Sequence, residues 1–132
     1  MTRFVNLGQF IGDLNNMNQV IEDAVGLITR KVSLDVLSRV VLATPVLTGR
    51  ARGNWQVDVG GVPSGELTVT DPGGGATISA GSAKIGEVKQ KPFQEVNLVN
   101  NLPYISALNG GSSNQSPAGF VENAVDAAVR FT

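Results

Sequence analysis

The sequence contains no cysteine and no histidine, and aromatic residues make up only 5% of its 132 residues. Without cysteine, the chain has no disulfide framework, thiolate metal site or cysteine nucleophile. Without histidine, it lacks the commonest general base and metal ligand at neutral pH. Its 11 acidic residues are scattered and form no compact pair or cluster of the kind a hydrolase or magnesium site uses. We therefore expect a protein that is not an enzyme and that binds no metal or cofactor.

The chain also lacks an excess of charge of either sign. Ten basic and 11 acidic residues leave a net charge of −1. Recognition of nucleic acid depends on a clustered positive excess, so the composition does not predict it. A near-neutral chain has little long-range repulsion between its copies and tends to associate with itself.

Long hydrophobic runs are absent as well. No run approaches the roughly 20 apolar residues of a membrane span. The first residues lack the apolar core and the cleavage site of a signal peptide. We therefore expect a soluble protein that is made in a cytoplasm and does not contact a membrane.

The length predicts one domain, 1–132, with an N-terminal arm at 1–12 and a long helix at 13–43. Apolar residues recur along 13–43 at spacings of three and four, which is the helical period. Pro45 should end this helix, because the residue before a proline is pushed out of the helical region. Several β-branched residues weaken the helix propensity of its second half, so it needs tertiary or subunit packing.

A sheet is predicted after the long helix. Trp55, Val57 and Val59 alternate with polar residues, which is typical of a strand with one buried face. Eight of the 16 glycines lie at 60–86, where Asp-Pro-Gly-Gly-Gly predicts the tip of a hairpin. We expect a flexible glycine-rich hairpin at 60–91. The strands expected within the antiparallel sheet of 54–99 are 54–59, 66–70, 76–80, 84–91 and 93–99.

Two further helices are predicted near the C-terminus. Pro103 is well placed at the first position of a short helix, 103–109. Ser116 and Pro117 are a favourable N-cap and first helical residue for a C-terminal helix, 116–131. The predicted fold class is α+β, with the long N-terminal helix and the C-terminal helix packed on an antiparallel β-sheet that carries the long hairpin.

Arg50 and Arg52 flank a small residue close to the only tryptophan, Trp55. As a pair, the arginines could bind phosphate or a carboxylate, or form the solvated rim of a loop. We favour ion pairs across a subunit boundary, because arginine and tryptophan are over-represented at interfaces. Charge reversal at both arginines would then block assembly and leave the monomer folded.

Three segments resemble one protein family. Thr44–Trp55 contains Thr-Pro-x-x-Thr-Gly, then a basic residue, and ends at an aromatic residue. Asn100–Gly111 begins Asn-x-x-Pro-Tyr and leads to a glycine, and Ser116–Val121 contains Pro-x-Gly-aromatic-Val. In order and spacing, over 20–129, they resemble the tail-completion or neck protein family of long-tailed bacteriophages. Asn109 departs from the family, which usually carries a glutamate after the tyrosine, and the glycine-rich segment is longer than the family's hairpin.

The resemblance implies a structural virion protein of the phage neck, assembled in the host cytoplasm. Its copies would form a ring, with six as the expected number, that caps the tail and joins it to the capsid portal. Its partners would be other copies of itself, adjacent neck or connector proteins, the tail terminator and tube, and phage DNA touched non-specifically in the lumen. The hairpin is expected to become ordered when a neighbouring ring docks. The residues expected at the interfaces are Arg50, Arg52, Trp55, Pro103, Tyr104, Asn109, Pro117 and Phe120.

Other functions remain open. A tail terminator or a head-completion stopper is also a small ring protein at the same junction. A protein of another class, a module that binds a small ligand or glycan, would use the sheet face with Trp55 and Tyr104.

Overall fold

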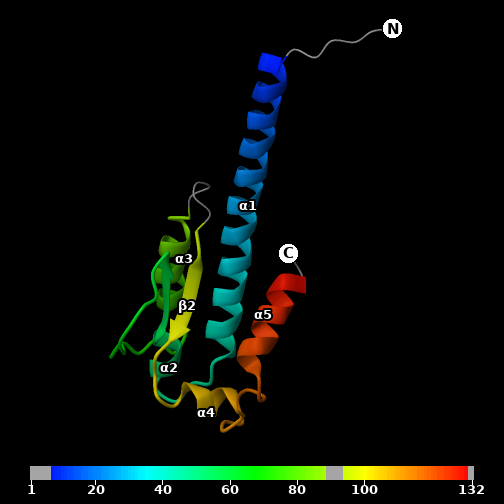
Figure 1. Cartoon of the computed structure of the whole chain (residues 1–132). Coiled ribbons are helices and arrows are strands. Elements are labelled where there is room, and N and C mark those ends of the chain that lie inside the picture. Colours follow the sequence, from blue (N-terminus) through cyan, green and yellow to red (C-terminus); the bar gives the residue numbers. More distant parts are fainter. Residues whose placement is uncertain (1–6, 89–93, 131–132) are drawn as a thin grey trace.

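A computed structural model describes residues 7–88 and 94–130 of the chain. It confirms the α+β class, because a long N-terminal helix and a C-terminal helix accompany a two-stranded antiparallel sheet (Figure 1). The helices are α1 (Leu7–Ala43), α2 (Arg50–Gly53), α3 (Gly75–Ile85), α4 (Ile105–Asn109) and α5 (Phe120–Arg130), and the strands are β1 (Trp55–Val59) and β2 (Val96–Asn100).

Helix α1 has 37 residues, which makes it about 55 Å long. It begins at Leu7, so the expected arm at 1–12 is wrong for its second half, and positions 1–6 lie outside the described residues. Gly8 and Gly12 lie within the helix; a glycine costs about 1 kcal/mol relative to alanine but leaves the backbone hydrogen bonds in place. The helix ends at Ala43, just before Pro45, as expected.

The C-terminal half of α1 lies between α5 on one side and α3 with the sheet on the other (Figure 1). The hydrophobic core forms where these elements meet. Helix α5 packs on α1 rather than on the sheet, because the buried side chains of α5 face the long helix. The buried core residues are Leu37, Val40, Val41, Val57, Ile85, Phe120 and Ala124.

The two strands confirm the expected strands at 54–59 and 93–99, with shifted bounds and with Phe93 outside the described residues. They pair antiparallel, with Trp55 opposite Asn100 and Val59 opposite Val96. Only Val57 in the middle of β1 is buried, because α3 packs on β1 and its Gly81 lies against Val57.

The predicted glycine-rich hairpin is wrong. Residues 66–70 form no strand, and α3 replaces the expected strand at 76–80. Thr77, Gly81 and Ile85 lie four residues apart and are all buried, so this segment follows a helical period. A Cβ atom on Gly81 would lie 2.4 Å from Leu37 Cδ2, so the absence of a side chain allows α3 to pack directly against α1. The expected strand at 84–91 is also wrong: Lys84 and Ile85 end α3, 86–88 lie outside any strand, and 89–91 are outside the described residues.

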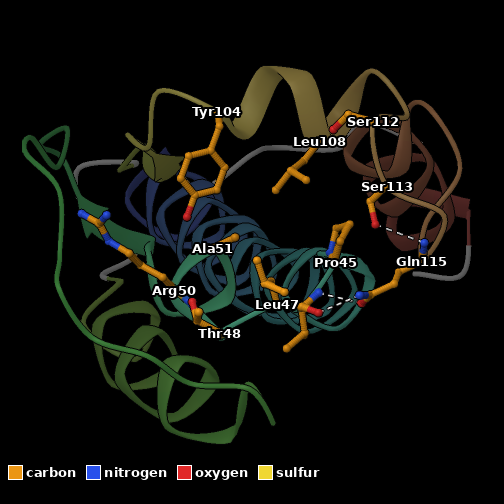
Figure 2. Close-up of a pocket in the computed structure, with 12 residues that line it drawn as sticks. Pro45, Leu47, Thr48, Arg50, Ala51, Tyr104, Leu108, Ser112, Ser113 and Gln115 are labelled. Carbon is orange, nitrogen blue, oxygen red and sulfur yellow. Dashed lines mark hydrogen bonds between the residues drawn. The ribbon is translucent and has the colours of Figure 1, made fainter.

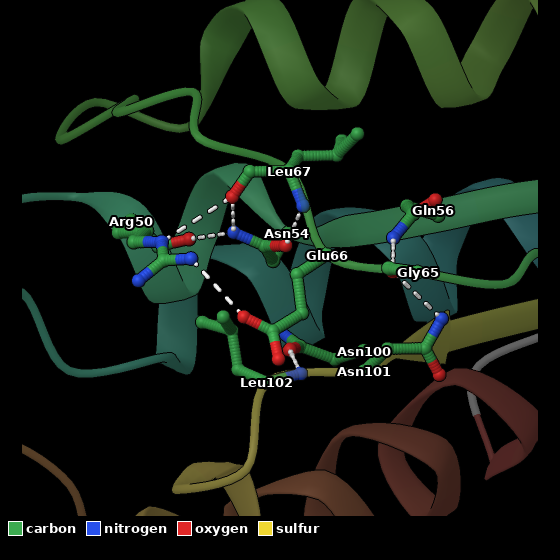
Figure 3. A network of polar contacts seen from close by, with 9 residues as sticks. All are labelled: Arg50, Asn54, Gln56, Gly65, Glu66, Leu67, Asn100, Asn101 and Leu102. Carbon is green, nitrogen blue, oxygen red and sulfur yellow. Dashed lines mark hydrogen bonds and ion pairs between the residues drawn. The ribbon is translucent and has the colours of Figure 1, made fainter.

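Side-chain amides hold the segment at 61–71, where the hairpin was expected. Asn54 Oδ1 accepts the backbone N–H of Leu67 at 2.6 Å, and Asn54 Nδ2 donates to Leu67 O at 2.9 Å (Figure 3). Gln56 and Asn101 both donate to Gly65 O at 3.0 Å. These contacts lie within one chain, and the expectation that this segment becomes ordered on docking stays a prediction.

Helix α5 begins at Phe120, four residues later than expected, and Ser116 is not its N-cap. The Ser116 hydroxyl donates instead to the Ala43 carbonyl at the end of α1. The first turn of α5 is capped by Asn109, whose Oδ1 accepts the Val121 N–H at 3.0 Å. Phe131, the last apolar residue of the expected helix, lies outside the described residues.

Candidate functional site

The three segments that resemble the phage family lie together at the end of the molecule where α1 stops (Figure 1). We call these three segments, together with the adjoining Gln115, the turn cluster, which comprises residues 44–55, 100–111 and 115–121. Val46 N donates to Gln115 Oε1 at 2.7 Å, and Gln115 Nε2 donates back to Val46 O at 2.6 Å. Asn100 Nδ2 donates to Ala51 O at 2.9 Å. Segments separated by about half of the chain therefore form one structural unit.

The turn cluster, with Ser112 and Ser113, lines an open cavity of about 680 Å³ (Figure 2). Tyr104 and Leu108 lie on one side of it, and the segment 45–51 lies on the other. Leu47 is 97% exposed and Tyr104 is 42% exposed, so both apolar groups are available at the surface. The lining residues are Pro45, Val46, Leu47, Thr48, Gly49, Arg50, Ala51, Tyr104, Leu108, Ser112, Ser113 and Gln115.

Arg52 finds its partners inside the chain. Its guanidinium donates to Leu42 O at 2.8 Å, to Thr44 O at 2.9 Å and to Pro72 O at 2.7 Å. The last carbonyls of a helix have no partner within it and carry partial negative charge, which a cation stabilises. Arg52 therefore caps the C-terminus of α1 and ties it to the turn before α3. An interface role for Arg52 stays a prediction.

Arg50 lies at the surface. It pairs with Glu66 at 3.1 Å and donates from Nε to Leu67 O at 3.3 Å (Figure 3). Both side chains of the ion pair are more than one-third exposed, so the pair contributes little to stability. Arg50 also lines the cavity, which keeps it accessible to a partner.

The other predicted interface residues divide between core and surface. Trp55 is half-buried, and its Nε1 donates to the buried Thr44 Oγ1 at 2.8 Å. Phe120 is a core residue, whereas Pro103, Tyr104 and Pro117 are exposed. Trp55 does not line the cavity, so the structure does not bring it together there with Tyr104.

Asn109 joins α4 to α5. Its Nδ2 donates to both carboxylate oxygens of Glu122 at 3.0 Å, in addition to the cap that it provides for Val121. The Asn109 amide lowers the pKa of Glu122 below its ordinary value, because it stabilises the charged carboxylate. The residue that departs from the family pattern therefore has a structural role within this chain.

Neither a metal site nor a membrane helix is found within residues 7–88 and 94–130. No group of three potential metal-ligating side chains gathers there, and no helix there combines the length and the apolar character that crossing a membrane requires. Comparisons with models of protein families, with curated proteins and with solved structures find no match to this chain. Any assignment of function therefore depends on the sequence segments and on the geometry of the surface.

Sequence reasoning missed Asp71, which caps the N-terminus of α3. Its Oδ2 accepts the Thr77 N–H at 2.8 Å and the Thr77 hydroxyl at 2.7 Å, and its Oδ1 accepts the Gly74 N–H at 3.2 Å. The Thr77 hydroxyl, followed by the Thr77 N–H, lowers the pKa of Asp71 below the ordinary value of 3.8. Aspartate is a residue type that is favoured at helix starts, and this was the signal that the sequence offered.

Asp71→Asn is expected to lower the free energy of unfolding by about 1 kcal/mol at pH 7, because a carboxylate is the better partner for the orphan N–H groups. The pKa of Asp71 is lowered on folding, so the carboxylate stabilises the protein above pH 3.8, and this stabilisation is lost as pH falls through the folded-state pKa. Urea unfolding at pH 7 and well below pH 3.8 measures both effects. The difference between wild type and variant should shrink at the lower pH.

Asp126→Asn is the matched control, because this carboxylate is exposed and lies 3.9 Å from Arg130. It should change the free energy of unfolding by less than about 0.5 kcal/mol. If Asp71→Asn lowers the free energy of unfolding by the same amount at both pH values, the Asp71 carboxylate does not stabilise the start of α3 through its charge.

Proposed function

We propose that this protein is a structural subunit of the bacteriophage neck. It would form a tail-completion or head–tail connector ring that caps the tail, joins it to the capsid portal and leaves a lumen for DNA. One observation carries the proposal: the three sequence segments that resemble this family, 44–55, 100–111 and 116–121, fold into a single turn cluster.

We propose further that the turn cluster is the face that docks on an adjoining neck protein or on the tail. Its cavity has an apolar rim with Leu47 and Tyr104 exposed. Apolar and aromatic side chains that are left exposed around a hollow are typical of protein interfaces. Arg50 at the edge of this hollow is the predicted interface arginine best placed to contact a partner, since each guanidinium nitrogen of Arg52 already donates to a carbonyl within the chain.

Two measurements test the proposal. Native mass spectrometry with negative-stain microscopy of the purified chain should detect closed rings with a central opening. The chain should also bind DNA-filled heads and finished tails of the phage that carries its gene. A strict monomer at high concentration, with no affinity for either particle, would refute the proposal. Binding to tails alone would favour a tail terminator, and binding to filled heads alone would favour a stopper.

Leu47→Ser is expected to weaken docking to the partner particle at least about tenfold, the loss expected for one well-packed apolar anchor. Its thermal midpoint should stay within about 2 °C of wild type, because Leu47 is 97% exposed and contributes little to the folded monomer. Val62→Ser is the matched control, since Val62 is 69% exposed and lies outside the cavity. Equal affinity of both variants for the particle would argue against the turn cluster as the docking face.

The cavity keeps a second candidate function open, a module that binds a small ligand or glycan. Its volume of about 680 Å³ falls in the range of about 300 to 1,000 Å³ that is common for small-ligand sites. Tyr104 would be the aromatic contact, and Trp55 would take no part. A sugar or metabolite that raises the thermal midpoint of wild type but not of Tyr104→Ala would support this candidate.

A further inference from the structure

The N-terminal part of α1 carries an apolar face that nothing in the described chain covers. None of the described residues before Gly26 is buried, and Figure 1 shows this part of the helix extending beyond the other elements. Large apolar side chains are nevertheless frequent along it. Those that are exposed are Leu7, Phe10, Ile11, Leu14, Met17, Val20, Ile21, Val25, Leu27 and Ile28.

The spacing of these residues is that of a coiled coil. Leu7, Ile11, Leu14, Asn18, Ile21, Val25 and Ile28 follow one another at alternating steps of four and three. This heptad repeat places all seven on one seam, with Asn18 as the single polar member. At 3.6 residues per turn, the centre of the seam lies about 120° around the helix from the mean direction of the buried residues Leu37, Val40 and Val41, so most of the seam faces a different side of α1.

A membrane surface fits this face poorly. Helices that lie on membranes are rich in lysine and arginine on their polar side. Between Leu7 and Thr29 there is no basic residue, whereas there are three acidic ones, Asp13, Glu22 and Asp23. The partner is therefore better sought among proteins.

A second copy of the same chain fits it well. The seam carries no charge, so two identical seams can meet without repulsion. When two copies run parallel and in register, their Asn18 side chains face each other and can share a hydrogen bond, whereas other registers bury each Asn18 against apolar groups. The six apolar seam residues are between 38% and 70% exposed, so their side chains are available to a partner.

We infer that residues 7–28 of α1 form the contact between copies of this chain, packed parallel and in register. The inference rests on the proposed function for the ring, because helices that run along the axis of a cyclic ring are parallel in all copies. The apolar arc extends from the seam to Val20 and Leu27 and covers about half of the helix circumference. A two-stranded coil would leave that extension exposed, whereas a helix with a neighbour on each side would cover it.

Ile21→Asp tests the inference by placing a charge in the seam. Sedimentation of the full chain should show a dissociation constant between copies that is raised at least about a hundredfold. Asn16→Asp is the matched control: it adds the same charge to an exposed position of the same helix, outside the seam, and should keep wild-type association. Both variants should melt like wild type at a concentration where all are monomers, because neither residue is buried.

Because the chain has no cysteine, a single introduced cysteine allows a second measurement by cross-linking. Under mild oxidation, Leu14→Cys should give a disulfide-linked dimer, because parallel helices in register bring identical seam positions within disulfide reach. Asn16→Cys should cross-link far less. Wild type that stays monomeric at high concentration, or Leu14→Cys that cross-links no better than Asn16→Cys, would overturn the inference. Wild type that stays monomeric while binding phospholipid vesicles would overturn it in favour of a membrane surface.

The same variants separate this inference from the proposed function. Copies that associate through α1 but bind neither heads nor tails would support the contact and refute the phage role. Rings that form normally with Ile21→Asp would overturn the contact and leave the phage role standing.

Discussion

Gly49→Ala is expected to lower the free energy of unfolding by about 4 kcal/mol, a large part of the stability of an ordinary domain. Gly49 has a φ of +90°, a conformation that costs other residues about 1–2 kcal/mol. A Cβ atom there would also lie 2.4 Å from Pro72 N and 2.8 Å from Asp71 C. These are backbone atoms that cannot rotate away, so the overpacking cost of about 1–3 kcal/mol adds to the conformational cost. Urea unfolding followed by circular dichroism measures the sum.

Gly60→Ala separates the two costs. Gly60 has a similar φ of +82°, but a Cβ atom there would have nothing within 4 Å. It should therefore lose only about 1–2 kcal/mol. If Gly49→Ala costs no more than Gly60→Ala, the turn at Asp71 and Pro72 can move aside and the predicted clash is absent.

The close approach at Gly49 also explains the Thr-Gly pair in the first of the three resembling segments. The Gly49 carbonyl accepts the N–H groups of both Gly53 and Asp71 at 2.9 Å. One residue thus starts α2 and fixes the turn that leads to the cap of α3. The sequence marked this position as a turn, but the partner 22 residues further along could be identified only from the structure.

The parts of the fold that were predicted from the sequence depend on local signals. The apolar spacing in α1, the stop before Pro45 and the alternation in β1 are all set by neighbouring residues. Helix α3 was missed because its buried face is made of Thr77, Gly81 and Ile85, of which only one is a large apolar residue. Its contact with Leu37 and its cap from Asp71 are tertiary, and the alternating Ala-Thr-Ile-Ser-Ala pattern favoured a strand.

Only part of the candidate site was predicted, because local signals identify individual residues but not the contacts that they make in the folded chain. The sequence drew attention to Arg52, Trp55 and Tyr104, and all three belong to the turn cluster. It did not indicate that Arg52 and Trp55 would contact the end of α1, because the position of a carbonyl acceptor depends on the folded chain. Nor could the apolar spacing of α1 distinguish residues that the chain covers itself, such as Leu37, from those that it leaves exposed, such as Ile21.

Arg52→Ala is expected to lower the free energy of unfolding by about 3 kcal/mol. Three backbone carbonyls, those of Leu42, Thr44 and Pro72, would lose a charged donor at once. Hydrogen bonds to charged groups contribute about 1.5–3 kcal/mol each, and exposure to water at this site keeps the total near the value for one or two of them. The thermal midpoint should fall by roughly 10 °C. Arg52→Lys should recover little, because an ammonium cannot match the fork of a guanidinium.

Arg130→Ala is the control, because it also removes an arginine but leaves the three carbonyl contacts of Arg52 intact. Arg130 is 72% exposed and lies 3.9 Å from Asp126. It should stay within about 0.5 kcal/mol of wild type. Charge reversal at Arg52 should therefore destabilise the monomer at least as much as Arg52→Ala does, whereas the sequence led us to expect that it would block assembly and leave the monomer folded. If Arg52→Ala melts like Arg130→Ala but fails to assemble, the three carbonyl contacts are unimportant and the subunit boundary is the correct place for Arg52. Arg50→Ala should show the reverse behaviour, with normal melting and impaired docking, because its ion pair with Glu66 is exposed and Arg50 lies at the edge of the cavity.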